Sequence, residues 1–253
     1  MEASANIHTP LSDSENNIAP HVILDLRAQA KSLEFSSDGH LFAASCNCEA
    51  ALWDAKTFSL ICNLDVPSNE GPLYTSFTPD GRAIWLASEE GIIARHGILS
   101  YAHNIPPIRT SYTISCIKSS PDGMYLAVAI KSSATLLDST TSDAHDVKSS
   151  VKLYDCMGQE LATLVAGGSD DYICSLSFTA DGERLTGISE DGAMFVWDTD
   201  SRTLVAGPFP QPAPAFQVAY SLGNDLVASA GPTGQIKVWK KHIGQEKVTP
   251  HIT

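Results

Sequence analysis

The sequence predicts an all-β protein assembled from about five copies of one small antiparallel sheet. The first observation is a motif centred on Asp-Gly, which occurs at Asp38, Asp80, Asp122 and Asp181 and returns in altered form at 223–224. The second is the spacing of about 42 residues between most copies, with one longer interval before Asp181. A repeat of this length is typical of one supersecondary unit whose core forms only when the copies stack.

The fourth copy shows what each unit contains. Residues 173–178 and 184–189 are short apolar or alternating runs on either side of the Asp-Gly turn, as in a β-hairpin. A second turn leads to 194–198, and a polar turn separates this run from 203–206. Each unit is therefore predicted to be a four-stranded antiparallel sheet. A lone sheet of this size cannot bury both faces, whereas sheets packed radially can, which favours a β-propeller.

We expect the propeller to span residues 21–240, after a disordered leader at 1–20 and before a tail at 241–253. The units are expected near 28–66, 67–108, 109–165, 166–209 and 210–240, and the third carries an insertion at 131–150. Residues 21–26 resemble 59–64, which we expect to form the fourth strand of the first unit. This N-terminal strand is therefore expected to complete the fifth blade, so that the ring closes and the chain is a monomer.

A dipeptide near the end of each third strand carries a resemblance to a known family. It is Trp53-Asp54 and Trp197-Asp198 in two units, and the other units have Tyr154-Asp155, Trp239-Lys240 and His96-Gly97. In the fourth unit Ser189 and Asp191 precede Trp197 by eight and six residues. These features resemble the WD40-repeat family over roughly 21–240, and residues 196–208 are similar to tandem WD40 arrays of fungal proteins.

The resemblance implies a structural role for one set of residues: Ser45, Trp53, Ser88, Ser189, Asp191, Trp197 and Trp239. In the family, such Ser, Asp and Trp side chains form a buried hydrogen-bonded network that the His of a Gly-His dipeptide completes. That dipeptide is missing from this sequence, and Gly168-Ser169 stands in its place in the fourth unit. We expect an incomplete network, with a cost of about 1–3 kcal/mol for each polar group left unpaired.

Composition limits the class of partner and the compartment. The formal charge of −13 and the pI near 4.9 oppose binding to nucleic acid or to an anionic membrane. The sequence has no apolar run long enough for a membrane helix, no signal-peptide pattern at residues 1–20 and no Asn-x-Ser/Thr sequon. We therefore expect a cytoplasmic or nuclear protein whose six cysteines are reduced.

No motif in the sequence predicts catalysis, a cofactor or a metal. The Gly-x-Ser-x-Gly elbow, the phosphate-binding loop and the His-Glu-x-x-His pair are all missing. Cys46 and Cys48 share one strand face without a second pair at zinc spacing. The run 189–192 is superficially similar to the Asp-box of sialidases, but Gly follows Asp directly. A propeller hydrolase or lectin is thus the third interpretation of the function.

The resemblance implies that partners bind where the loops between units meet the turns between second and third strands. The residues expected there are Glu49, Glu70, Glu89, Glu90, Tyr112, Asp170, Asp171, Tyr172 and Glu190. Their negative potential would attract a basic peptide or protein, although acidic turns also serve solubility alone. The sequence therefore predicts a non-catalytic interaction scaffold. The alternative is a fragment or shortened remnant of a larger WD40 sensor array.

Overall fold

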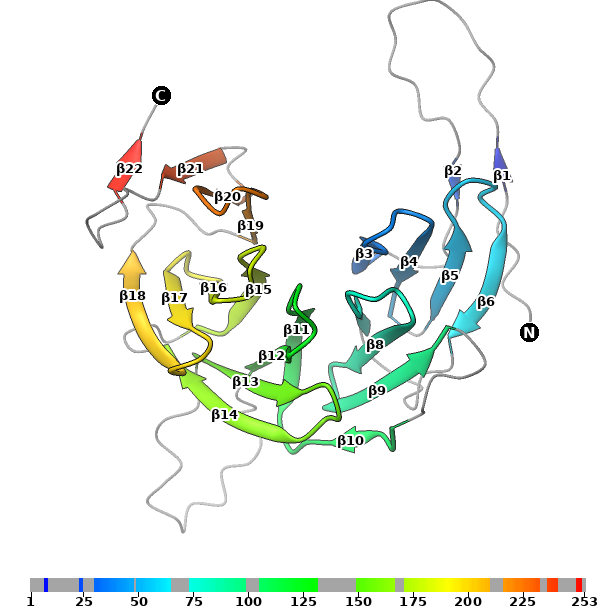
Figure 1. Ribbon diagram of the computed structural model, residues 1–253, viewed down its shortest axis with the longest axis horizontal. Helices are drawn as coiled ribbons and strands as arrows, with labels where there is room; N and C mark the ends of the chain where they lie inside the picture. Colours follow the sequence, from blue (N-terminus) through cyan, green and yellow to red (C-terminus); the bar gives the residue numbers. More distant parts are fainter. Residues whose placement is uncertain are drawn as a thin grey trace, which may run out of the picture.

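The computed structural model describes residues 7–8, 23–24, 30–47, 49–64, 73–98, 105–131, 149–166, 171–209, 216–232, 236–240 and 249–251. Five four-stranded antiparallel sheets follow one another along an arc, with the first strand of each sheet innermost (Figure 1). A further two-stranded sheet pairs β1 (Ile7–His8) with β2 (Ile23–Leu24). The predicted all-β fold with five four-stranded sheets is thus confirmed.

Each sheet keeps chain order from its inner to its outer strand. The first two sheets are β3 (Ser32–Phe35), β4 (Leu41–Ser45), β5 (Ala50–Asp54) and β6 (Leu60–Leu64), then β7 (Leu73–Phe77), β8 (Ala83–Ser88), β9 (Ile92–Gly97) and β10 (Ile108–Arg109). The third sheet is β11 (Thr113–Ser119), β12 (Tyr125–Lys131), β13 (Ser149–Asp155) and β14 (Glu160–Val165). The last two are β15 (Ile173–Phe178), β16 (Arg184–Ser189), β17 (Met194–Asp198) and β18 (Thr203–Phe209), then β19 (Gln217–Tyr220), β20 (Leu226–Ala230), β21 (Ile236–Lys240) and β22 (Thr249–His251).

The Asp-Gly motif closes the first hairpin of a sheet. In the second sheet the Asp80 carboxylate accepts hydrogen bonds from Thr78 Oγ1 at 2.6 Å and from Arg82 N at 3.0 Å. Gly81 has a φ of 65°, a left-handed conformation that costs glycine little. The fifth sheet lacks this glycine, and Asn224 takes the positive φ there. The motif recurs in the sequence because each hairpin needs this turn.

Hydrogen bonds between neighbouring inner strands line the axis of the arc. Side-chain oxygens of one inner strand accept backbone amides 43 residues further along the chain: Glu34 from Phe77, Ser76 from Ser119, Ser175 from Val218 and Ser177 from Tyr220. An ion pair of 2.5 Å between Lys118 and Glu34 joins the third sheet to the first. The inner strands are therefore tied to one another and not only packed side by side.

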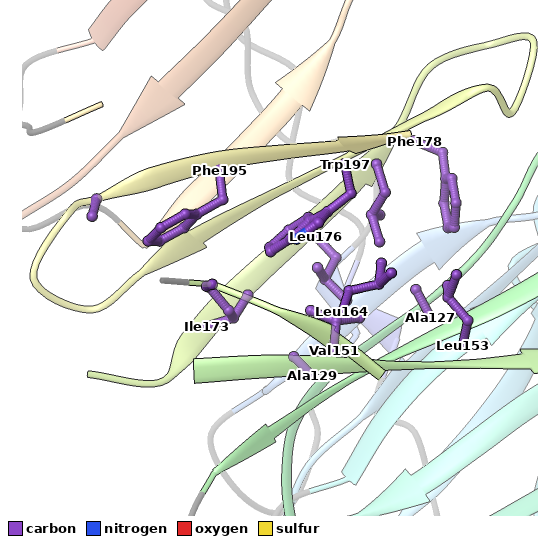
Figure 2. Close-up of a cluster of buried hydrophobic side chains, with 13 residues drawn as sticks. Ala127, Ala129, Val151, Leu153, Leu164, Ile173, Leu176, Phe178, Phe195 and Trp197 are labelled. Atoms are coloured by element: carbon purple, nitrogen blue, oxygen red, sulfur yellow. The ribbon is translucent and has the colours of Figure 1, made fainter. Parts of the chain in front are cut away.

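The hydrophobic core lies between the sheets. The largest cluster joins the third sheet to the fourth, where Trp197, Phe178 and Leu176 face Leu153 and Leu164 (Figure 2). Smaller clusters fill the other three junctions between consecutive sheets. No sheet buries both of its faces alone, so each one depends on its neighbours.

The ring does not close in the way that we expected. The fifth sheet takes its fourth strand from β22, which lies in the segment 241–253 that we expected to be a tail. The expected closing strand at 21–26 contributes β2, which pairs instead with β1 inside the expected disordered leader at 1–20. Figure 1 shows the first and fifth sheets at the two ends of an arc. Within the described residues, β3 and β19 share no set of contacts comparable to those between consecutive inner strands.

Candidate interaction surface

The turn between β8 and β9 carries Glu89 and Glu90 and is fastened to the loop that leads into the third sheet. Ile114 N donates to the Glu89 carbonyl at 3.0 Å, and Thr110 N donates to the Gly91 carbonyl at 2.8 Å. A Cβ on Gly91 would lie 2.4 Å from the Tyr112 carbonyl oxygen, so only glycine permits this approach. The carboxylates of this turn thus stand on a rigid base.

In the fourth sheet, the corresponding turn carries Glu190 and is joined to the loop of its own sheet that carries Asp171 and Tyr172. Glu190 N donates to the Tyr172 carbonyl at 3.1 Å, which joins the loop before β15 to the turn between β16 and β17. Lys131, the last residue of β12, places Nζ 4.4 Å from the centre of the Tyr172 ring. Burial and the adjacent Glu190 carboxylate raise the pKa of Tyr172 to about 12, so the phenol stays neutral at neutral pH.

Tyr74 on β7 is half-buried and senses the charge of the first of these turns. Burial, followed by the charge of Glu89, raises the pKa of Tyr74 well above its ordinary value, and Tyr172 acts in the same direction. Burial likewise raises the pKa of Cys116 to about 11 and of Cys174 to about 12. These inner-strand thiols are therefore protonated at neutral pH and unsuited to nucleophilic chemistry. Tyr74, Lys131 and the two thiols were not singled out from the sequence.

The structure brings together part of the expected partner-binding set. We call Glu89, Glu90, Asp171, Tyr172 and Glu190 the acidic loop face. Glu90, Asp171 and Glu190 are exposed, while Glu89 and Tyr172 are half-buried. Glu49 is half-buried in the turn between β4 and β5. Glu70 and Asp170 lie outside the described residues, as do 132–148 of the insertion.

Tyr112 differs from the anchor that we expected. Its ring lies 5.4 Å from Lys152 Nζ, and this lysine also forms a 2.5 Å ion pair with Glu160. The half-buried Tyr112 side chain packs against the core between the second and third sheets. Because the Tyr112 ring packs against this core, it offers little surface to a partner, so we leave Tyr112 out of the acidic loop face.

The residues of the expected structural set make separate hydrogen bonds and do not form one network. The Ser189 hydroxyl donates to Asp191, and Asp191 accepts Ala193 N at 3.1 Å, so both residues serve the turn between β16 and β17. Trp197 Nε1 donates instead to the Val165 carbonyl of the preceding sheet, at 3.3 Å. Ser45 Oγ reaches the Leu73 carbonyl of the next sheet at 2.7 Å, and Ser88 Oγ accepts Ile92 N at 3.3 Å.

The indole groups of Trp53 and Trp239 are left without hydrogen bonds. Both Nε1 atoms are buried, and neither has a hydrogen-bond partner in the structure. The two rings still fill core positions, since each side chain is at most 5% exposed. The tryptophan thus contributes packing in these sheets without completing a polar network.

Two features of the described residues bear on the class of protein. They hold no group of three or more His, Cys, Asp or Glu side chains arranged for a metal ion. They also hold no helix long and apolar enough to cross a membrane. The acidic loop face itself consists of carboxylates and the Tyr172 ring, with Lys131 beside them.

Radially arranged four-stranded sheets with their first strands innermost define a β-propeller class of protein. Residues 158–198 match the WD40 family, described as WD domain, G-beta repeat. The matched segment ends at the Trp197-Asp198 dipeptide. The resemblance to WD40-repeat propellers that the sequence predicts is confirmed.

Two known proteins show how far this likeness extends. The Periodic tryptophan protein 2 homolog of Schizosaccharomyces pombe (strain 972) is 32% identical over 89 residues, which are 35% of this chain and 10% of that protein. The chain thus matches about a tenth of this relative's length. The crystal structure of the Cps50 (Swd1) β-propeller domain of Myceliophteria thermophila superposes with a TM-score of 0.69 at 12% identity, over 89% of this chain and 71% of that one. The second likeness concerns the fold alone.

Proposed function

We propose that this chain is a non-catalytic interaction module that binds a basic segment of another protein on its acidic loop face, in the cytoplasm or nucleus. WD40 propellers are typically interaction scaffolds, but a fold does not fix a function, so the argument rests on the surface. The observation that carries the proposal is that Glu90, Asp171 and Glu190 are exposed in turns at one end of the strands, where Glu190 N donates to the carbonyl of the half-buried Tyr172. A negative surface of this kind speeds the encounter with a positively charged partner.

Lys131 indicates how a partner would be held. Its ammonium group lies over the Tyr172 ring, beside the Glu190 turn, so the face already accommodates one basic side chain. An aromatic face with a nearby carboxylate attracts a cation through both the ring quadrupole and the charge. A lysine or arginine of the partner would take the place of Lys131 or bind next to it. Lys131 is therefore a competitor whose removal should tighten binding.

The test is the affinity for a fluorescent Lys/Arg-rich peptide, measured by anisotropy. Changing the exposed Glu90 and Glu190 to Lys should weaken binding by about tenfold or more. The matched control changes Glu183 and Asp200, exposed residues of turns at the opposite ends of the strands, to Lys. This control has the same net charge and should bind almost as well as the native chain. Lys131→Met should bind more tightly than native.

Equal weakening by the two charge reversals would show that net charge alone attracts the peptide, and the proposal would then be wrong. A peptide of the same length with Glu in place of Lys and Arg should not bind at all. Binding should also weaken with added salt, because surface charges are screened.

A second candidate is that the chain forms part of a larger array, and a specific observation favours it. Leu33 and Phe35 on the first sheet and Ile236 and Val238 on the fifth are exposed, although their equivalents in the fourth sheet are buried: Leu176, Phe178, Met194 and Val196. Apolar faces at sheet ends favour association. Light scattering at rising concentration should show self-association, and a Leu33→Ser, Ile236→Ser variant should reduce it. A native chain that stays monomeric throughout would remove this support.

A further inference from the structure

A cavity of about 430 Å³ lies between the second and third sheets, at the end of the strands that carries the Asp-Gly turns. Its lining includes Trp85, Arg95, Ser119 and Leu126. The volume falls within the range of about 300–1,000 Å³ that is usual for small-molecule sites. The turn between β8 and β9, and with it the acidic loop face, lies at the other end of the strands. The cavity is therefore independent of the proposed peptide-binding function.

Substitutions at repeated positions account for the cavity. Ser119 stands where the other units have an aromatic residue: Phe35, Phe77, Phe178 and Tyr220. Arg95 stands where they have an aliphatic residue: Leu52, Leu153, Val196 and Val238. Its cross-strand partner Trp85 replaces a small residue, as the pairings of Leu52 with Ala43 and of Val196 with Thr186 show. Compared with the other junctions, this one lacks the aromatic ring at the position of Ser119 and contains instead the indole of Trp85 and the guanidinium group of Arg95.

Arg95 and Ser119, the two polar residues at these positions, each have a buried atom without a hydrogen-bond partner. Arg95 Nε and Ser119 Oγ are both shielded from solvent, and neither makes a hydrogen bond in the structure. The Arg95 guanidinium carbon lies 5.8 Å from the centre of the Trp85 ring, and the described residues provide no salt bridge to it. Buried donors without acceptors are unfavourable, so a ligand that supplies an acceptor would relieve both.

The acidic residues of the lining are engaged in their own turns. The Asp80 carboxylate accepts Thr78 Oγ1 and Arg82 N, and Asp122 accepts Ser120 Oγ at 2.5 Å and Met124 N at 3.0 Å. Burial alone would raise the pKa of Asp80, but these bonds and the charges of Arg82 and Arg95 lower it. In both carboxylates the accepting atom is Oδ1. Arg95 Nε and Ser119 Oγ are the buried atoms of the lining that lack a hydrogen bond, and both can donate.

We propose that this cavity is a binding site for a small aromatic carboxylate. The guanidinium of Arg95 and the hydroxyl of Ser119 would hold the carboxylate, because charge-assisted bonds to guanidinium are strong and planar. The flat body of the ligand would lie against Trp85 and the apolar wall at Leu126.

The experiment compares three probes that share a ring: benzoate, benzamide and benzamidine. The readout is the indole N–H signal of Trp85 in NMR titrations of the full chain, assigned with a Trp85→Phe variant. Benzoate should shift this signal saturably, benzamide should bind about tenfold more weakly, and benzamidine should leave it unchanged. Benzamidine binding as tightly as benzoate would show that Asp80 and Asp122 govern the site and would overturn the proposal. So would the failure of all three probes to bind.

Two variants use residues that other units already carry at these positions. Arg95→Leu should keep the fold by circular dichroism and weaken benzoate by at least about tenfold, with a smaller change for benzamide. Ser119→Phe should fill the cavity, abolish binding of both probes and raise the melting temperature. If Ser119→Phe does not fold, Ser119→Ala removes only the hydroxyl and should still weaken benzoate. Unchanged benzoate affinity in Arg95→Leu would refute the site.

Discussion

Equivalent positions of the repeat are buried at the junction between the third and fourth sheets and exposed on the two end faces of the arc. Leu176 and Phe178 are 4% and 6% exposed in the middle of the arc, whereas the equivalent Leu33 and Phe35 of the first sheet are 66% and 59% exposed. On the other face, Met194 is 1% exposed and its equivalent in the fifth sheet, Ile236, is 72% exposed. The repeat supplies an apolar side chain at each place, but only a neighbouring sheet buries it. Stability in this chain is therefore a property of junctions.

The sharpest test of this comparison is one substitution at two equivalent positions. Phe178→Ala should lower the free energy of unfolding by about 3–5 kcal/mol, because it leaves a cavity among Leu153, Leu164 and Trp197. Phe35→Ala should cost less than about 1 kcal/mol, because that ring is largely solvated and contacts mainly Phe42. Chemical denaturation of both variants measures the difference. Equal losses would mean that the end face is covered in solution.

A smaller effect is expected from overfilling the tight junction. A Cβ added at Gly187 would lie 2.9 Å from the Trp197 ring and 3.1 Å from Ile173 Cγ2. Gly187→Ala should therefore cost about 1–3 kcal/mol of unfolding free energy. The control is Ser229→Ala at the equivalent position of the fifth sheet, where we expect a change of less than about 1 kcal/mol. A neutral Gly187→Ala would show that this junction is looser than the structure indicates.

The smallest effect should be the same in the first sheet, at the end of the arc, and in the second sheet, because it comes from the local turns. Hydrogen bonds from Ser36 and His40 lower the pKa of Asp38, and for Asp80 the bonds from Thr78 and Arg82 outweigh burial. A carboxyl with a lowered folded pKa stabilises the protein above its ordinary pKa of 3.8, and this contribution is lost as the pH falls below that value. Asp38→Asn and Asp80→Asn should each lower the denaturation midpoint at pH 6 and have less effect near pH 3. A markedly larger shift for Asp80→Asn would show that turn stability also depends on neighbouring sheets.

The sequence was sufficient for the repeated parts of the fold. Asp38, Asp80, Asp122 and Asp181 predict hairpin turns because the same hydrogen bonds need Asp and Gly at the same places. The apolar runs around them predict the strands, since a half-buried strand leaves a pattern of period two. These local signals do not depend on which sheets become neighbours.

Ring closure was beyond what the sequence could determine. The pattern of residues 21–26 predicts an outer strand. It does not indicate with which other strand this segment pairs. The strand that the fifth sheet uses, β22, contains Pro250 and lacks an alternating apolar pattern. Proline is tolerated there because an outermost strand has one unpaired side.

The carboxylates and Tyr172 of the candidate surface were predictable from the sequence, but Lys131 beside them was not. Glu89, Glu90 and Glu190 stand in turns that the repeat locates, so their shared face follows from the order of the strands. Lys131 was counted within the insertion, and its contact with Tyr172 depends on the packing of the third sheet against the fourth. Arg95 and Ser119 could have been noticed as exceptions when the five units are aligned. Their unpaired atoms are visible only in three dimensions.

The hydrogen bonds of the inner strands bear on how such a chain changes length over generations. In each bond, the accepting side chain and the donating amide are 43 residues apart, one residue more than the repeat. A duplicated unit can therefore supply the acceptor for the next unit and the amide for the preceding one. The long insertion of the third unit lies between β12 and β13 and leaves the amide donated by Ser119 in place. Gene duplication of the second unit, which carries both the acceptor Ser76 and the amide of Phe77, would therefore lengthen the arc without redesigning its axis.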